Sequence, residues 1–286
     1  MHDRLFVALQ YFLPKQALTV LAGRFASARW GAVTQFAIRR FVERYQVDMA
    51  EAAQPDIASY ASFNEFFTRA LRADARPLAT ADWVCPVDGA ISQFGAIEAG
   101  QIFQAKGHAY SATALLGGDA ALAAQFAQGH FATLYLSPRD YHRIHMPCAG
   151  ELRHMVHVPG ALFSVNPATA RSIPGLFARN ERVVCVFDSS HGPFVLVLVG
   201  ATIVGSMATV WHGQVNPPRP GVVRRWDYGA GEVRLEQGQE MGRFQLGSTV
   251  VLLLPRKAGQ TLCFEARWQA GQGVRLGEAM ASYSAS

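Results

Sequence analysis

The stretch that decides the fold lies late in the chain, where residues 244–255 read FQLGSTVVLLLP. The apolar run 250–254, closed by Pro255, predicts a strand that is covered on both faces. Glycine weakens the interior of a strand unless the backbone must bend or something must approach it closely. The Gly247-Ser248 pair therefore indicates either a bulge or turn entering the strand, or a place where close approach is needed.

Strands are predicted for most of the chain after Pro77. Short runs rich in Val, Leu and Phe alternate with Gly and Pro from there to the C-terminus. The clearest runs are 182–188 and 193–205, and the intervening SSHGP predicts a turn between them.

Helices are predicted ahead of these strands. Pro14 and Gly31 divide residues 1–45 into short helices that mix apolar clusters with arginines. A further short helix is predicted over residues 62–72, because Ser62 and Glu65 have the spacing of a capping box.

The division between helices and strands predicts an α+β fold in two regions. We expect a helical N-terminal region, residues 1–76, followed by a β-rich body, residues 77–286.

The charge of the chain is concentrated at its N-terminus. The net charge is +5, and residues 1–45 hold seven basic residues against two acidic ones, so the remainder is neutral. Cations spaced by bulky apolar residues favour helices that lie in a membrane interface and face anionic lipids. A helical cap with a solvated basic face is the second interpretation, and a nucleic-acid surface is the least favoured. No run of 18 apolar residues predicts a transmembrane span, and nothing after the apolar residues 5–13 resembles a signal cleavage site.

Three stretches hold side chains that could carry chemistry. Asp88 lies in CPVDGAIS, where an Asp-Gly turn would also explain it. His142 and His145 lie in YLSPRDYHRIHMPCAG, where the spacing to Cys148 is compatible with a metal site. We predict no metal, because the proline-containing, strand-like context does not place these side chains on one helical face. The third stretch contains Ser248.

Asp, His and Ser are the components of a triad that activates a serine nucleophile. A serine hydrolase commonly displays its nucleophile on a G-x-S-x-G turn between a strand and a helix. Ser248 is instead followed directly by an apolar strand. This context favours a serine that attacks its own chain.

The motifs together resemble those of the bacterial phosphatidylserine decarboxylases, which are pyruvoyl-dependent enzymes. The resemblance covers almost the whole chain and includes PVDG, LSPRDYHRIHMP, LFSVN, FARNERV, VGATIVGS and QGQEMGRFQLGST. The most specific match is FQLGST, which is similar to the self-cleavage site of the family.

The resemblance implies a role for each candidate residue. Ser248 would attack the carbonyl carbon of Gly247, cleave the chain into a β chain (1–247) and an α chain (248–286), and become the covalent pyruvoyl group. Asp88 and His145 would complete the maturation triad with Ser248, and His142 would transfer a proton during decarboxylation. Phosphatidylserine would bind as a Schiff base and leave as phosphatidylethanolamine.

The resemblance also implies a setting for the enzyme. We expect a peripheral protein on the cytoplasmic side of the cell membrane, with residues 1–76 on anionic lipids and residues 77–286 as the catalytic domain. It further suggests a homodimer. No nucleic-acid partner is expected, because the N-terminal cations are spaced by bulky apolar residues and are not clustered. Pyridoxal phosphate is a poorer electron sink for this chain, since only Lys106 of its three lysines has an internal setting.

Two other functions stay open on the residues alone. A lipid hydrolase with a Ser-His-Asp triad would cleave esters while its own chain stays intact. A lipid-binding module without catalysis would keep its membrane affinity after Ser248 is replaced.

Overall fold

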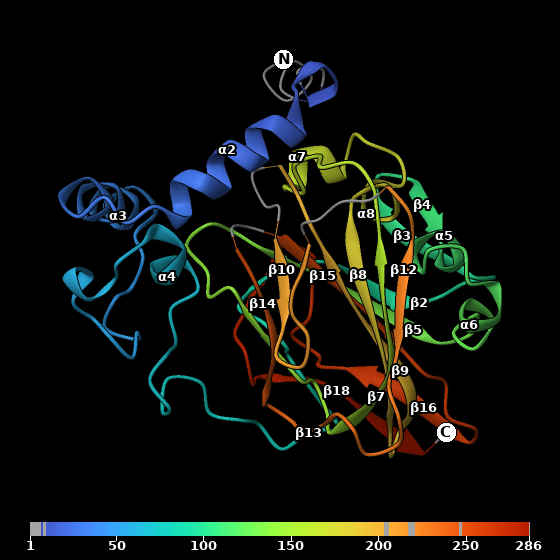
Figure 1. Cartoon of the computed structure of the whole chain (residues 1–286). Coiled ribbons are helices and arrows are strands. Elements are labelled where there is room, and N and C mark those ends of the chain that lie inside the picture. The colour runs from blue at the N-terminus through green and yellow to red at the C-terminus, as the bar shows by residue number, and fades with distance from the viewer. Residues whose placement is uncertain (1–6, 8–9, 203–205, 217–220, 246–247, 286) are drawn as a thin grey trace.

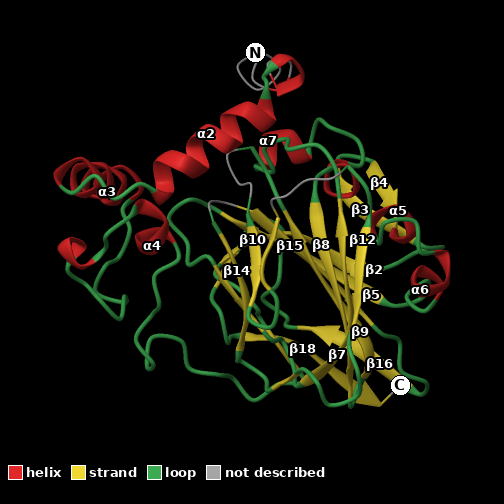
Figure 2. Cartoon of the chain, viewed as in Figure 1, coloured by secondary structure: helices red, strands yellow, loops and turns green. Residues whose placement is uncertain are grey.

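The structure is a computed structural model that describes residues 7, 10–202, 206–216, 221–245 and 248–285. The N-terminal helices lie at one end of the molecule, short helices border the strands elsewhere, and the C-terminus is at the end far from the N-terminal helices (Figure 1). Colouring by secondary structure shows the N-terminal helices at upper left and further short helices at the right of the strands (Figure 2). The predicted mixture of helix and sheet is confirmed.

The N-terminal helices are α2 (Lys15–Ser27) and α3 (Ala32–Tyr45). Pro14 and Gly31 occupy their N-cap positions, so the predicted breaks are confirmed. In the part of the chain that the structure describes, no helix combines the length and the apolar character needed to cross a membrane.

The helix predicted over 62–72 is shorter than expected. The 3-10 helix η1 (Ile57–Ser59) precedes it, and α4 itself spans Phe63–Phe67. Ser62 caps α4 by accepting a hydrogen bond from the Glu65 amide at 3.2 Å. The helix ends early because the chain turns to form a β-bridge between Leu71 and Ala52.

The central strand β15 (Ser248–Leu254) is buried at every residue, as the apolar run predicts. It lies inside a nine-stranded sheet between β5 (His130–Leu136) and β9 (Gly192–Val199). Both neighbours run antiparallel to it, with Ser248 opposite Leu136. The remaining strands of this sheet are β2 (Gly89–Ala96), β7 (Gly150–Val158), β8 (Arg182–Ser189), β12 (Arg224–Asp227), β13 (Arg234–Leu235) and β17 (Gly273–Val274).

The hairpin predicted near residue 190 is confirmed, since β8 ends at Ser189 and β9 begins at Gly192. The second strand is shorter than the predicted 193–205. It ends at Val199, residues 200–202 lie outside any strand, and residues 203–205 lie outside the described residues.

Three smaller sheets surround the central one. The four-stranded sheet has the order β11 (Gly213–Asn216), β10 (Met207–Thr209), β14 (Glu240–Phe244) and β6 (Arg143–His145). The three-stranded sheet contains β1 (Trp83–Val84), β18 (Ala279–Ala285) and β16 (Gln260–Phe264), and the two-stranded one pairs β3 (Gln101–Ala105) with β4 (His108–Ser111).

Four short helices interrupt the β-rich body, and the sequence patterns did not predict them. They are α5 (Ala112–Leu115), α6 (Ala120–Ala124), α7 (Pro167–Ala170) and α8 (Leu176–Arg179). Each spans four or five residues, too few for an amphipathic period to be read. Three of them begin at a side-chain cap, provided by Ser111, Asp119 and Asn166.

Candidate active site

Ser248, the predicted nucleophile, is the first residue of β15 and is fully buried. Its Oγ has no hydrogen-bond partner among the described residues, and neither has Oγ1 of Thr249 beside it. Buried hydroxyl groups are normally hydrogen-bonded, so the unpartnered Ser248 Oγ marks a place where chemistry or binding is expected. Thr249 Oγ1, from the next residue of the strand, belongs to the opposite face. Gly247, on the other side of the predicted cleavage point, lies outside the described residues.

The histidine-containing segment approaches Ser248 from the neighbouring strand. β5 ends at Leu136, which is the residue opposite Ser248. The chain then turns, with the Asp140 carboxylate accepting a hydrogen bond from the Ser137 amide at 2.7 Å. The carbonyl oxygen of His142 accepts a hydrogen bond from the Phe244 amide at 3.0 Å. The segment that carries the histidines therefore runs beside the segment that leads to Ser248.

His142 is fully buried against Phe67, with the two ring centroids 4.0 Å apart. Its Nδ1 donates to the Asp140 carbonyl at 2.7 Å, and its Nε2 has no partner among the described residues. Burial lowers the pKa of His142 to about 3. The ring is therefore neutral near pH 7 and presents Nε2 as a proton acceptor.

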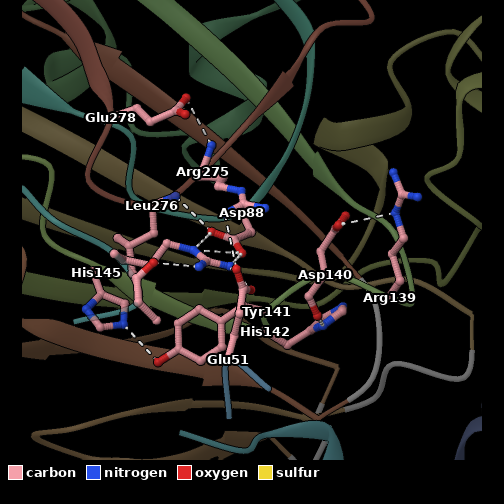
Figure 3. Close-up of polar contacts among 12 residues, drawn as sticks. Glu51, Asp88, Arg139, Asp140, Tyr141, His142, His145, Arg275, Leu276 and Glu278 are labelled. Atoms are coloured by element: carbon pink, nitrogen blue, oxygen red, sulfur yellow. Dashed lines mark hydrogen bonds and ion pairs between the residues drawn. The ribbon is translucent and has the colours of Figure 1, made fainter. Parts of the chain in front are cut away.

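His145 lies on β6 and makes a different set of contacts. Its Nδ1 donates to the Gly238 carbonyl at 2.8 Å, and its Nε2 accepts from the Tyr141 hydroxyl at 3.2 Å. Burial lowers the pKa of His145 against the smaller opposing effect of the Gly238 carbonyl. The two histidines lie on either side of Tyr141 (Figure 3), as expected for extended backbone.

Asp88 is buried, and its carboxylate is held by an arginine and a backbone amide. Arg76 donates to both oxygens at 2.6, 2.9 and 3.2 Å, and the Leu276 amide donates at 2.8 Å. No hydrogen bond joins Asp88 to His145 among the described residues. The Gly238 carbonyl accepts from Nδ1 of His145 and fixes its tautomer, and the joint role of Asp88 and His145 in maturation stays a prediction.

The backbone nevertheless brings Asp88 near His145. The His145 amide donates to the Pro86 carbonyl at 2.9 Å, two residues before Asp88. The structure thus places Asp88 and His145 on adjoining segments without direct contact between their side chains.

Arg76 connects Asp88 to a second carboxylate. It donates a hydrogen bond to the Glu51 carboxylate at 2.7 Å, and Glu51 also forms an ion pair with Arg275 at 3.1 Å. Burial opposes the charge on Arg76, but the hydrogen bonds to Asp88 and Glu51 outweigh it and raise the pKa of Arg76. No local spacing in the sequence indicates Arg76 or Gly238, because both meet their partners only through the fold.

A cavity of about 490 Å³ lies beside these groups and is lined in part by Asp88, Asp140 and Tyr141. The close-up in Figure 3 shows the ion pairs along its wall. A second cavity of about 520 Å³ shares Gly89, Arg139 and Asp140 with it. Both volumes are within the range of small-molecule sites.

Comparison with known proteins identifies the relatives of this chain. The family profile described as "Phosphatidylserine decarboxylase" matches residues 63–282, and a second profile, described as "PSD", matches residues 5–46. A phosphatidylserine decarboxylase proenzyme of Verminephrobacter eiseniae is 72% identical over 284 residues, which cover 98% of either chain.

Two further relatives show the same extent of similarity. The phosphatidylserine decarboxylase proenzyme of Delftia acidovorans is 71% identical over 281 residues, again 98% of both chains. That of Azoarcus sp. is 70% identical over 280 residues, 98% of this chain and 96% of the relative. With identity this high across nearly the full length, and with the motif-bearing serine and histidines on adjoining buried segments, the chain belongs to the phosphatidylserine decarboxylase family.

Proposed function

We propose that this chain is a self-processing, pyruvoyl-dependent enzyme that converts phosphatidylserine to phosphatidylethanolamine. The observation that supports it best is Ser248, fully buried at the start of a central strand with an Oγ that has no partner among the described residues. A serine hydrolase must expose its nucleophile to substrate from the start, whereas a self-cleaving serine first reacts with its own backbone and meets substrate only after the chain is cut. Family membership supports the same conclusion.

Maturation begins with proton transfer from Ser248. His145 accepts the proton through Nε2 after that atom is released from the Tyr141 hydroxyl, and Oγ attacks the carbonyl carbon of Gly247. The peptide C–N bond breaks as the C–O bond of an ester forms. Elimination across Ser248 then releases residues 1–247 with a terminal carboxylate and leaves dehydroalanine, which water converts to the pyruvoyl group with loss of ammonia.

The surroundings of Ser248 fit such a group. His142 Nε2 is a buried acceptor without a partner among the described residues, and the segment that carries it runs beside the segment leading to Ser248. A pyruvoyl group supplies a carbonyl that binds the substrate amine covalently and accepts the electrons released with carbon dioxide. His142 moves the proton that the product carbon needs, and Asp88 keeps a negative charge near His145.

Intact mass spectrometry tests maturation. The purified chain should appear as two polypeptides, the smaller containing the 39 residues 248–286 with a blocked N-terminus. Ser248→Ala should stay whole and form no phosphatidylethanolamine. An active wild-type chain that stays uncleaved would contradict the proposal, and ester cleavage by that chain would favour the hydrolase.

The N-terminal region supports membrane binding, which we include in the proposal. Residues 11–45 contain eleven of the sixteen large hydrophobic residues described as exposed. Phe12, Leu21 and Phe36 are 85%, 66% and 65% exposed, respectively. Between α2 and α4 lies an apolar hollow of about 750 Å³, bordered by Leu21, Phe25, Trp30 and other residues.

Helix α4 links this apolar surface to the candidate active site. Phe63 borders the hollow, Phe67 packs on His142, and the two phenylalanine rings stack 6.1 Å apart. Such a path allows acyl chains to stay in an apolar environment while a head group reaches the histidine.

Vesicle co-sedimentation of full-length variants tests the membrane surface. Replacing Phe12, Leu21 and Phe36 by serine should weaken binding to anionic vesicles. The binding that remains should come from the arginines and should therefore decrease as salt is added. Serine at Val222 and Val223, which are 59% and 51% exposed on the β-rich body, provides the matched control. Equal binding by all three proteins would move the membrane surface elsewhere.

The domain boundary, the cellular location and the oligomeric state complete the proposal. We place the boundary between the membrane-binding and catalytic regions near residue 76, and the protein on the cytoplasmic face of the cell membrane. We also propose a homodimer, which light scattering of the cleaved protein would test.

A further inference from the structure

Arg69 is a buried cation that no carboxylate contacts directly among the described residues. The residue comes two positions after the end of α4 and is only 5% exposed. The Nε has no hydrogen-bond partner, and no ion pair involves the guanidinium among the described residues. Its guanidinium carbon lies 5.3 Å from the centre of the Phe66 ring.

Among the described residues, Arg182 and Arg76 have buried side chains whose donors are satisfied. Arg182, 3% exposed, donates to the carbonyls of Leu115, Asn180 and Ala114 at 2.6 to 2.8 Å. Arg76 is held by two carboxylates. A buried charge without such partners is destabilising, so its retention indicates a partner that arrives with a ligand.

The location of Arg69 points to an anionic ligand beside the catalytic histidine. Arg69 lines the cavity of about 490 Å³ together with Tyr141 and Asp140, the residues next to His142. Phe67, two residues before Arg69, packs directly on His142. The carboxylates of Asp88 and Glu51 in that cavity are directly paired with Arg76 and act on Arg69 only from a distance, so its donors stay open to a ligand.

We propose that Arg69 binds the phosphodiester of the phospholipid substrate and thereby holds its head group beside His142. This inference rests on the proposed function and adds the residue that recognises the lipid. A guanidinium presents parallel N–H donors that match two non-bridging phosphate oxygens.

The chemistry favours the phosphodiester over the substrate carboxylate. The carboxylate loses its charge as carbon dioxide forms, so an arginine bound to it would stabilise the ground state more than the transition state. The phosphodiester keeps its charge throughout the reaction. Arg69 bound to it therefore lowers KM without opposing the chemical step.

Calorimetric titration of the full-length Ser248→Ala chain tests the proposal without dependence on the pyruvoyl group. The probe is glycerophosphoserine, and O-methylserine is the matched compound with the same amine and carboxylate but no phosphodiester. Adding Arg69→Gln should weaken glycerophosphoserine binding about 10- to 100-fold and leave O-methylserine unaffected. Arg72→Gln, which removes an exposed arginine three residues along the chain, should change neither.

Three results would overturn the proposal. The first is no binding of glycerophosphoserine to Ser248→Ala at millimolar concentration, and the second is equal binding with and without Arg69→Gln. The third is an equal loss for O-methylserine, which would make the carboxylate the partner of Arg69.

Thermal unfolding separates ligand binding from a structural role. Since Arg69 is an unpaired buried charge, Arg69→Gln should melt at or above the temperature of its parent. A lower melting temperature with unchanged affinity would make Arg69 a structural residue and overturn the proposal. If wild type fails to cleave, the proposed function fails, but binding to the uncleavable chain still decides the role of Arg69.

Discussion

Replacing Arg76 should destabilise the protein more than most single substitutions. The Arg76 and Asp88 side chains are 8% and 10% exposed, and Glu51 is 23% exposed. Breaking a buried ion pair by removing one partner costs about 3–5 kcal/mol, because the other charge stays buried. Asp88 keeps the Leu276 amide and Glu51 keeps Arg275, so we expect Arg76→Met to lie near the lower end, about 3 kcal/mol.

Urea unfolding in the Ser248→Ala background provides the measurement, because the chain then unfolds as one polypeptide. Arg76→Lys should lose about 1–2 kcal/mol, since an ammonium keeps the charge but not the two-pronged geometry. Adding Asp88→Asn to Arg76→Met should recover part of the lost free energy of unfolding, because the effects of substitutions at two contacting residues are not additive. A loss under about 1 kcal/mol for Arg76→Met, or strict additivity in the double variant, would refute this reasoning.

The other predictions concern the histidines and one glycine. His145→Ala and Asp88→Asn should accumulate uncleaved chain, whereas His142→Ala should cleave yet decarboxylate poorly; the opposite pattern on denaturing gels would exchange the two histidines' roles. Because burial lowers the pKa of His142 to about 3, the unfolded chain binds a proton that the folded chain does not. The free energy of unfolding of the uncleavable chain should therefore fall as pH falls from about 6.5 toward 3, by up to about 1.4 kcal/mol per pH unit more than with His142→Ala. Gly89→Ala should lose about 1–3 kcal/mol and slow cleavage, because its Cβ would lie 2.4 Å from a backbone oxygen of β5. Gly23→Ala, with nothing within 4 Å, is the control, and equal urea midpoints would refute the clash.

The parts of the fold that follow from local patterns could be predicted from the sequence. The apolar run after Ser248 encodes a strand buried on both faces, and Pro14 and Gly31 encode the helix breaks. The end of α4 could not be predicted, because a bridge to Ala52 determines it.

The contacts within the candidate site were less predictable than its residues. Motif resemblance singled out Asp88 and His145, yet nothing local shows that Asp88 is engaged by Arg76, or that Gly238 orients His145. Arg69 gave no sequence signal either, because an arginine after a short helix is ordinarily expected in solvent. Its burial depends on packing between segments distant in sequence.

The position of β15 determines how the two chains are held together after cleavage. The strand is bonded along both edges, to β5 and β9, and cleavage ahead of Ser248 would leave it in place between two strands of the larger polypeptide. The product is then a two-chain complex whose reassembly after unfolding is bimolecular and depends on concentration. The precursor folds as a single polypeptide. The cleaved enzyme retains this fold although the peptide bond between residues 247 and 248 is broken. Its lifetime would be governed by the rate of opening rather than by a reversible equilibrium.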